Sequence, residues 1–289
     1  GLNVLFNPQK IRKTVERACK DYSETTSIDA IVKELTRNIF DGATTEDIEK
    51  ALILSSTAFI ERDPHYSKVS SRIFLQRLYK EAMQVSVNDN NLDDQYKQTF
   101  IDGVRFGVKN NYLDSRLSEF DLEKLSNSLI VERDSLFEFI GIQTLYERYI
   151  LSHDDRKFEL PQAFWMRVAM GMALNESNKD SRALEFYNKL SSLEFVSSTP
   201  TLFHSGTPHP QLSSCYLTTV SDDLSHIFKC VGDNAQLSKW SGGLGNDWTS
   251  IRATGSQIKS TNVESQGVIP FLKIANDVTV AINRSGKRR

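Results

Sequence analysis

The amino-acid sequence predicts an α+β protein in which helices come first and strands follow. Over most of residues 1–205, apolar residues recur at the three- and four-residue spacing of amphipathic helices. From about residue 206 onward the chain becomes rich in glycine and in short runs that favour strands. With 289 residues, the chain has room for more than one domain and for a sizeable core.

Residues 1–86 are predicted to form a small helical unit whose helices begin at local capping signals. Asn7 can accept a hydrogen bond from an amide of the first turn, and Pro8 loses no hydrogen bond at the first helical position. Further helices are expected to start after Ser27, after the Thr44–Asp47 capping box and near Tyr66, and to end near Asp41-Gly42, Ile60 and Ala82. Residues 2–6 are expected to form a strand.

Residues 87–205 are predicted to be a second helical region, and residues 206–289 are predicted to be the part with strands. A polar stretch rich in Asn and Asp, at residues 85–92, indicates a linker or a turn between the two helical regions. In the last region, a strand is expected at Cys215 and a helix from Asp222 to Trp240.

The composition excludes several classes of protein. The net charge is −2 and charged residues make up 25% of the chain, which lacks the basic excess of a nucleic-acid-binding protein. No apolar run reaches the roughly eighteen residues of a membrane span, and the N-terminus has no secretory signal pattern. We therefore expect a cytoplasmic protein with reduced thiols that binds neither nucleic acid nor a membrane.

The three cysteines are too few and too scattered for a disulfide framework or a zinc site, and the five histidines lack metal-ligand spacing, so no metal site is expected. A free cysteine is most often a buried small hydrophobe, which is our interpretation of Cys19 and Cys230. Cys215 differs because it ends the string Gln211–Cys215, shortly after the string Thr199–Gly206. A thiol there could give hydrogen and electrons and then form a disulfide that an external dithiol reopens.

Three further features could bind a ligand, and each also has an interpretation without one. Thr199 and Ser214 are small hydroxyl residues that could bind phosphate or sugar oxygens, or could simply serve turns. The glycines of Gly242–Trp248 allow close backbone approach and could offer amides to oxyanions, although a glycine run alone is weak evidence. Asp222 and Asp223 could accept hydrogen bonds from a sugar hydroxyl, or could cap a helix.

The strings Thr199–Gly206, Gln211–Cys215 and Gly242–Trp248 resemble, in order and spacing, the start of the catalytic barrel in class I ribonucleotide reductase large subunits. The resemblance implies a helical N-terminal domain followed by the first part of a ten-stranded α/β barrel. It also implies that ribonucleoside diphosphates are reduced to deoxyribonucleoside diphosphates by thiyl-radical chemistry, with Cys215 as one of two redox thiols. The substrate would be lined by Thr199, Ser214, Cys215 and Gly243.

The same resemblance implies a specificity site for a deoxynucleoside triphosphate or ATP around the start of the helix that follows Cys215. It assigns this effector to Asp222, Asp223, Leu224, Arg252, Ile258 and Lys259. In the family this helix packs against its copy in a second subunit. A homodimer is therefore expected through Leu224, Ile227, Phe228, Val231 and Leu237. Residues 281–289 resemble the start of the loop that relays effector identity to substrate choice.

Residues 1–86 resemble the ATP-cone, the module that controls overall activity in these reductases. The resemblance assigns contacts with ATP to Asn7, Lys10, Ile11, Thr45 and Lys80. In the family, a Lys-Arg pair on the first strand contacts the phosphates, and here that strand would precede Gly1. We therefore expect a partial cone that binds ATP weakly.

The resemblance also implies partners and reactants. No covalently bound cofactor is expected, ATP and deoxynucleoside triphosphates would be allosteric effectors, a small (beta) subunit would supply the radical, and thioredoxin or glutaredoxin would be the reductant. The remaining catalytic residues of the family lie on barrel strands beyond Arg289. A C-terminal part encoded by a split gene, an intein, or a longer protein of which this chain is a piece would each account for this. The alternative function is a non-catalytic nucleotide-binding module that regulates reductase subunits or assembles with them.

Overall fold

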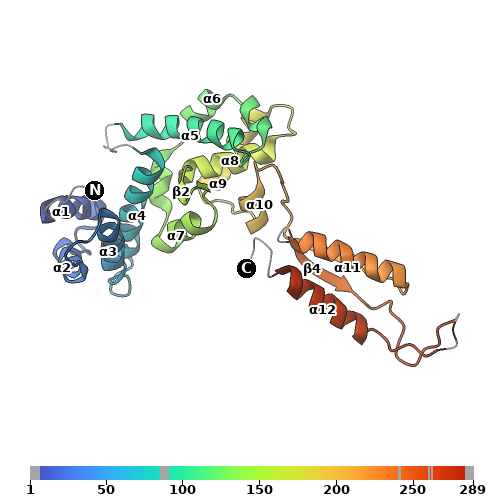
Figure 1. The fold of residues 1–289 in the computed structure, drawn as a ribbon. Coiled ribbons are helices and arrows are strands. Elements are labelled where there is room, and N and C mark those ends of the chain that lie inside the picture. The colour runs from blue at the N-terminus through green and yellow to red at the C-terminus, as the bar shows by residue number, and fades with distance from the viewer. Residues whose placement is uncertain (1–6, 85–90, 240–241, 260, 262, 284–289) are drawn as a thin grey trace. The chain divides into compact units, whose positions relative to one another are not determined.

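The computed structural model describes residues 7–84, 91–239, 242–259, 261 and 263–283. The chain divides into two compact units (Figure 1). The first unit comprises Gly1–Val196 with Gly206–Pro208, and the second comprises Ser197–Ser205 with His209–Arg289. The strand expected at residues 2–6, most of the linker expected at 85–92 and the end of the segment 281–289 lie outside the described residues.

The first unit opens with four helices at the predicted starts. They are α1 (Pro8–Cys19), α2 (Ile28–Asn38), α3 (Thr45–Thr57) and α4 (His65–Met83). The cap before α1 is confirmed because Asn7 Oδ1 accepts a hydrogen bond from Gln9 N at 3.0 Å. Ser27 caps α2 in the same way, and Thr44 forms a capping box with Asp47. Helix α2 ends at Asn38, before the expected Asp41-Gly42, and Gly42 takes a positive φ of 87° in the following turn.

The rest of the first unit is also helical, as predicted. Its α-helices are α5 (Leu92–Lys109), α6 (Leu122–Asn127), α7 (Phe139–Arg148), α8 (Pro161–Ala173) and α9 (Lys179–Ser191). Its short elements are the 3-10 helices η1 (Lys20–Tyr22), η2 (Ser115–Glu119) and η3 (Val131–Leu136), and the antiparallel pair β1 (Ser152–His153) and β2 (Arg156–Lys157). Helix α8 lies at the centre of this unit, because nearly all of its residues are buried.

Two buried polar groups tie α8 to its surroundings. Arg167 and Glu159 form an ion pair with an Nε–Oε1 distance of 2.6 Å, and both side chains are buried. Asp134 of η3 accepts hydrogen bonds from three neutral side chains and has no cation beside it in these contacts. Its donors are Tyr79 Oη at 2.7 Å, Tyr96 Oη at 2.9 Å and Gln162 Nε2 at 2.7 Å. Asp134 therefore joins α4, α5 and α8.

Helix α4 lies in the first helical region and contacts elements of both. It packs against α1 and α3 on one side and against α7, β2 and η3 on another. Phe74 of α4 is buried and makes edge-to-face contacts with Phe139 and Tyr146 of α7, with ring centroids 6.1 and 5.2 Å apart. For this reason residues 7–84 and 91–196 lie in one compact unit.

The second unit contains the strand predicted at Cys215 and the helix predicted after Asp222, followed by a second strand that the sequence did not predict. Its elements are α10 (Thr199–His204), β3 (Cys215–Thr219), α11 (Leu224–Lys239), β4 (Gly243–Asp247) and α12 (Ile269–Asn283). Strands β3 and β4 run parallel, so α11 forms the crossover that a parallel pair requires. Buried Val220, Ile227 and Cys230 form a small core together with Trp248, Ile251 and Phe271.

Among the described residues of the second unit, β3 and β4 form a two-stranded sheet that is not closed into a barrel. The predicted order of a helical part followed by a part with strands is confirmed. In the part of the chain that the structure describes, no helix is long and apolar enough to cross a membrane.

Candidate functional site

Cys215 is the first residue of β3, and its thiol is exposed. The other two cysteines, Cys19 and Cys230, are buried, in agreement with their interpretation as packing residues. Ser214 Oγ lies 3.7 Å from Cys215 Sγ, so a hydroxyl stands directly beside the thiol. Cys215 is therefore the cysteine that can meet a substrate or another thiol.

Gly243 of β4 lies opposite Cys215 in the parallel pair. Its amide donates a hydrogen bond to Ser214 O at 2.7 Å, so this glycine amide serves the strand pairing and is not free for an oxyanion, contrary to the prediction. A Cβ atom on Gly243 would lie 3.1 Å from Ser214 O and 3.5 Å from Cys215 Sγ. Glycine therefore leaves open space beside the thiol.

Helix α10 is tied to the segment that leads into Cys215. Thr201 Oγ1 donates a hydrogen bond to Leu212 O at 3.0 Å, and His204 Nδ1 lies 3.0 Å from Gln211 O. Gln211 Nε2 in turn donates to Tyr216 Oη at 2.8 Å, next to Cys215 in β3. The structure thus attaches the helix that begins with Thr199 to the strand that begins with Cys215.

The two predicted acids at the start of α11 have different partners. Asp223 Oδ1 accepts a hydrogen bond from His226 N at 2.9 Å, which is the helix-capping role that needs no ligand. Asp222 instead forms an ion pair with Arg252, with an Nε–Oδ2 distance of 2.7 Å. Both side chains of this pair are about one-third exposed, at 33% for Arg252 and 32% for Asp222, so a ligand can reach them.

Ile258 and Lys259 lie on a short hairpin-like loop that follows Arg252. Ile258 N donates to Val263 O at 2.9 Å, and Gln257 forms an isolated antiparallel bridge with Glu264. Lys259 is exposed on this loop. Both residues therefore follow Arg252 along the chain and lie on a separate segment of the second unit.

The predicted dimer residues of α11 differ in their exposure to solvent. Ile227 and Val231 are buried within their own unit, so they are not available to a second subunit. Leu224 and Phe228 are 61% and 49% exposed, one helical turn apart. Gly232 continues this row by another turn, and a Cβ atom there would meet nothing within 4 Å. Leu237 is partly buried, and its carbonyl accepts a hydrogen bond from Gly242 N at 3.0 Å.

The predicted ATP contacts lie on three of the first four helices. Asn7 and Lys10 stand at the start of α1 and are exposed, Ile11 follows them half-buried, and Thr45 is the first residue of α3. Lys80 lies in the last turn of α4, where its Nζ forms an ion pair with Glu49 Oε1 of α3 at 2.9 Å. An incoming phosphate would have to compete with Glu49 for this lysine.

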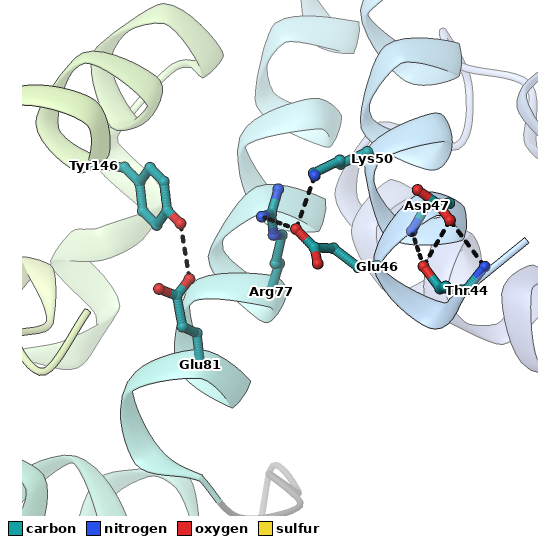
Figure 2. Close-up of polar contacts among 7 residues, drawn as sticks. All are labelled: Thr44, Glu46, Asp47, Lys50, Arg77, Glu81 and Tyr146. Carbon is teal, nitrogen blue, oxygen red and sulfur yellow. Dashed lines mark hydrogen bonds and ion pairs between the residues drawn. The ribbon is translucent and has the colours of Figure 1, made fainter. Parts of the chain in front are cut away.

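A cluster of polar residues near these positions was missed by the sequence analysis. Glu46 of α3 pairs with Lys50 at 2.8 Å, and its Oε1 lies 3.7 Å from Arg77 of α4 (Figure 2). Tyr146 Oη of α7 donates to Glu81 Oε2 of α4 at 2.9 Å. No sequence motif marks these residues, because they come from three elements that are distant along the chain.

The electrostatics of this cluster follow from burial and from nearby charges. Burial, followed by the hydrogen bond to Glu81, raises the pKa of Tyr146 to about 12, so its hydroxyl stays a donor at neutral pH. Burial also lowers the pKa of Lys157, against the attraction of Glu81 and Glu159. The hydrogen bond from Lys50 lowers the pKa of the exposed Glu46 carboxyl.

No group of three or more His, Cys, Asp and Glu side chains within the described ranges is arranged to hold a metal ion. The functional candidates are thus a thiol, a carboxylate–guanidinium pair and a set of charged residues on the first helices. The thiol can carry redox chemistry. The carboxylate–guanidinium pair and the charged residues can bind anionic ligands.

Comparison with known proteins finds matches over three successive parts of the chain. Three protein-family models match the chain: the ATP cone domain over residues 1–81, the ribonucleotide reductase all-alpha domain over 135–210 and the ribonucleotide reductase barrel domain over 213–289. The chain is 44% identical to the ribonucleoside-diphosphate reductase subunit alpha of Chlamydia pneumoniae, over 100% of this chain and 28% of that protein. It is 39% identical to the corresponding subunit of Helicobacter pylori, over 86% of this chain and 31% of that protein. The chain thus spans less than one-third of the length of these relatives.

Proposed function

Because the chain belongs to the ribonucleotide reductase large-subunit family and corresponds to its N-terminal part, we propose that it supplies one redox thiol, Cys215, for the reduction of ribonucleoside diphosphates. The observation that carries the proposal is the exposed thiol at the start of β3, with Gly243 leaving open space beside it. Ser214 stands next to the thiol as a hydroxyl that can bind the substrate. Thr199, at the start of α10, is proposed to bind the substrate as well.

The proposed chemistry balances with a pair of thiols. Two thiols give up two electrons and two protons, and a disulfide bond forms between their sulfurs. On the ribose, the bond between C2′ and its hydroxyl breaks, the oxygen leaves as water, and a hydrogen takes its place. Cys215 is one member of the pair. An external dithiol such as thioredoxin or glutaredoxin then reopens the disulfide.

The other reacting groups are proposed to come from outside this sequence. The second thiol and the thiyl radical belong to the remaining barrel of the reductase, since this chain spans 28% of its Chlamydia pneumoniae relative. A small radical-generating subunit is proposed as the source of the radical.

Nucleotide control is the second part of the proposal. The match to the ATP cone domain implies allosteric nucleotide effectors, and we assign ATP to Asn7, Lys10, Ile11, Thr45 and Lys80. We assign a deoxynucleoside triphosphate to the region around the Asp222–Arg252 pair, which offers a guanidinium for phosphate and a carboxylate for a sugar hydroxyl. Leu224, Ile258 and Lys259 complete this proposed site. The exposed apolar row of Leu224 and Phe228 supports a homodimer through α11.

The replacement Cys215→Ser tests the catalytic part. In enzyme reconstituted from this chain, the rest of the barrel and the small subunit, it should abolish formation of deoxyribonucleoside diphosphates while effector affinity stays the same. Cys230→Ser is the matched control, because Cys230 is buried in the small core of the second unit and should matter only for stability. Full turnover by the Cys215→Ser enzyme would overturn the redox role and would favour a non-catalytic module that only binds nucleotides.

A further inference from the structure

Helix α4 lies between the proposed ATP site and the helical domain. Lys80, in the proposed ATP site, is directed to α3, where it pairs with Glu49 at 2.9 Å. The next residue, Glu81, is directed to α7 and β2. Its Oε2 accepts from Tyr146 Oη at 2.9 Å and its Oε1 accepts from Lys157 N at 2.8 Å. Adjacent residues of one helix therefore face the two regions that nucleotide control has to connect.

Arg77 makes the connection one turn earlier on the same helix. Its guanidinium lies 3.7 Å from Glu46 Oε1 of α3 and 5.9 Å from the ring centroid of Tyr146 of α7 (Figure 2). The first contact is an ion pair and the second is a cation–π contact. The Arg77 side chain is 20% exposed and that of Glu46 is 62% exposed, so solvent reaches the ion pair from the Glu46 side. A single guanidinium is thus shared between α3 and α7.

The ion pair between Arg77 and Glu46 is loose enough to change. Its 3.7 Å separation exceeds a hydrogen-bond distance, and Glu46 also pairs with Lys50 at 2.8 Å. Glu46 follows Thr45 in the first turn of α3, where the helix dipole favours negative charge. A triphosphate bound at Thr45 would repel Glu46 and attract the nearby cations, including Arg77.

Movement of Arg77 would alter the contacts that hold α7 and β2. Tyr146 is held by Arg77 and Lys157 at its ring, with Lys157 Nζ 4.9 Å from the centroid, and by Glu81 at its hydroxyl. Glu81 also holds the backbone of β2 through Lys157 N. A change at the Tyr146 ring is therefore passed through Glu81 to the hydrogen bond that attaches β2 to α4.

We propose that Arg77 is a positioning residue that couples nucleotide binding at the first turn of α3 to the arrangement of α7 and β2. The inference rests on the proposed ATP site of the first four helices. It adds the series of contacts through which ATP binding at that site would change the helical domain. The series consists of Glu46, Arg77, Tyr146 and Glu81 (Figure 2). Coupling of this kind is reciprocal, so the state of α7 and β2 also sets the affinity for ATP.

Hydrogen exchange measured on this chain with and without ATP tests the proposal. In the unmodified chain, ATP should change the exchange of peptides from α3 and also of peptides that cover residues 139–157. In Arg77→Gln, the change in α3 should remain and the change at residues 139–157 should be lost. Tyr146→Phe keeps the ring but removes the hydrogen bond to Glu81, so it should weaken the distant change without preventing ATP binding.

Arg72→Gln is the matched control. Arg72 lies on the same helix, pairs with Asp21 at 2.6 Å and stacks over Tyr22 at 4.9 Å, but it does not contact α7 in these interactions. Its replacement should leave the ATP-dependent change at residues 139–157 intact. If Arg72→Gln removes that change as well, general destabilisation explains the result and the proposal is wrong. It is also wrong if the unmodified chain responds to ATP in α3 alone. If ATP changes the hydrogen exchange of no peptide, the proposed ATP site is wrong, and the proposed coupling is wrong with it.

Discussion

Gly243 lies opposite Cys215 in the parallel pair of β3 and β4, and a single added carbon on it would come 3.5 Å from the cysteine sulfur. The same carbon would lie 3.1 Å from Ser214 O, which is closer than most Cβ contacts in proteins. A side chain at position 243 would therefore stand in van der Waals contact with the thiol and cover it on this side. This relationship links the glycine-rich string to the cysteine string, which the sequence alone could only place in order.

Gly243→Val should crowd Cys215. We expect slower alkylation of the Cys215 thiol and a stability loss of about 1–3 kcal/mol from overpacking. Mass spectrometry of the chain after timed exposure to iodoacetamide measures the first effect, and chemical denaturation measures the second. Gly232→Ala is the control because a Cβ there meets open space, and alanine in α11 should raise stability by up to about 1 kcal/mol. Unchanged alkylation in Gly243→Val would show that this side of the thiol is not the open one.

Arg252→Gln should weaken binding of a deoxynucleoside triphosphate by about tenfold or more, because a charge-assisted contact to phosphate is lost. Equilibrium binding of labelled nucleotide to the chain measures this. The control is Lys229→Gln, which breaks a solvent-exposed ion pair with Asp233 on α11, 2.8 Å long, and should leave nucleotide affinity unchanged. Equal affinity in Arg252→Gln and the unmodified chain would remove Arg252 from the proposed effector site.

Asp134 should make the first unit less stable as pH rises from about 4 to about 6. Burial raises the pKa of Asp134 from 3.8 to about 6, against the hydrogen bonds from Gln162, Tyr79 and Tyr96. The folded state then binds the proton more tightly than the unfolded state. The resulting stability is complete below the unfolded pKa and is lost as pH rises through the folded pKa, by on the order of 3 kcal/mol.

Denaturation of the unmodified chain and of Asp134→Asn across this pH range isolates the contribution of Asp134, since all other groups are shared. Asp114→Asn gives the opposite sign. The hydrogen bond from Arg116 lowers the pKa of Asp114, so that residue stabilises the fold above its unfolded pKa and loses the effect as pH falls. The prediction fails if the difference between the unmodified chain and Asp134→Asn does not depend on pH between 4 and 6.

Leu224→Asp with Phe228→Asp should weaken self-association through α11 by at least about tenfold, because charge replaces exposed apolar surface. Sedimentation equilibrium of the chain measures the dimer affinity. Leu54→Asp is the control, since Leu54 is an exposed leucine on α3 of the other unit. In contrast, Ile227→Ala should act on folding and cost about 2–5 kcal/mol, because Ile227 is buried in its own unit. Dimer affinity that survives the double substitution would exclude this face of α11.

The helix starts and the order of the regions could be predicted because the interactions that set them are local. Asn7 caps α1 through a contact two residues away, and Thr44 and Asp47 cap α3 through contacts three residues away. Such contacts are present in the chain before any tertiary packing. The cysteine string and the glycine string predicted the chemistry of the site only through their resemblance to the reductase family, which compares residue types and order along the chain.

The sequence by itself thus determined the helical first part, the strand at Cys215 and the identity of the candidate thiol. The tertiary structure decided which of Asp222 and Asp223 is free to pair with Arg252, thirty residues from Asp222. It also decided which side of α11 is covered, and it assembled Arg77, Tyr146 and Glu81 from two helices. The physical reason is that periodicity defines the faces of a helix, while the packing of distant elements determines what each face meets.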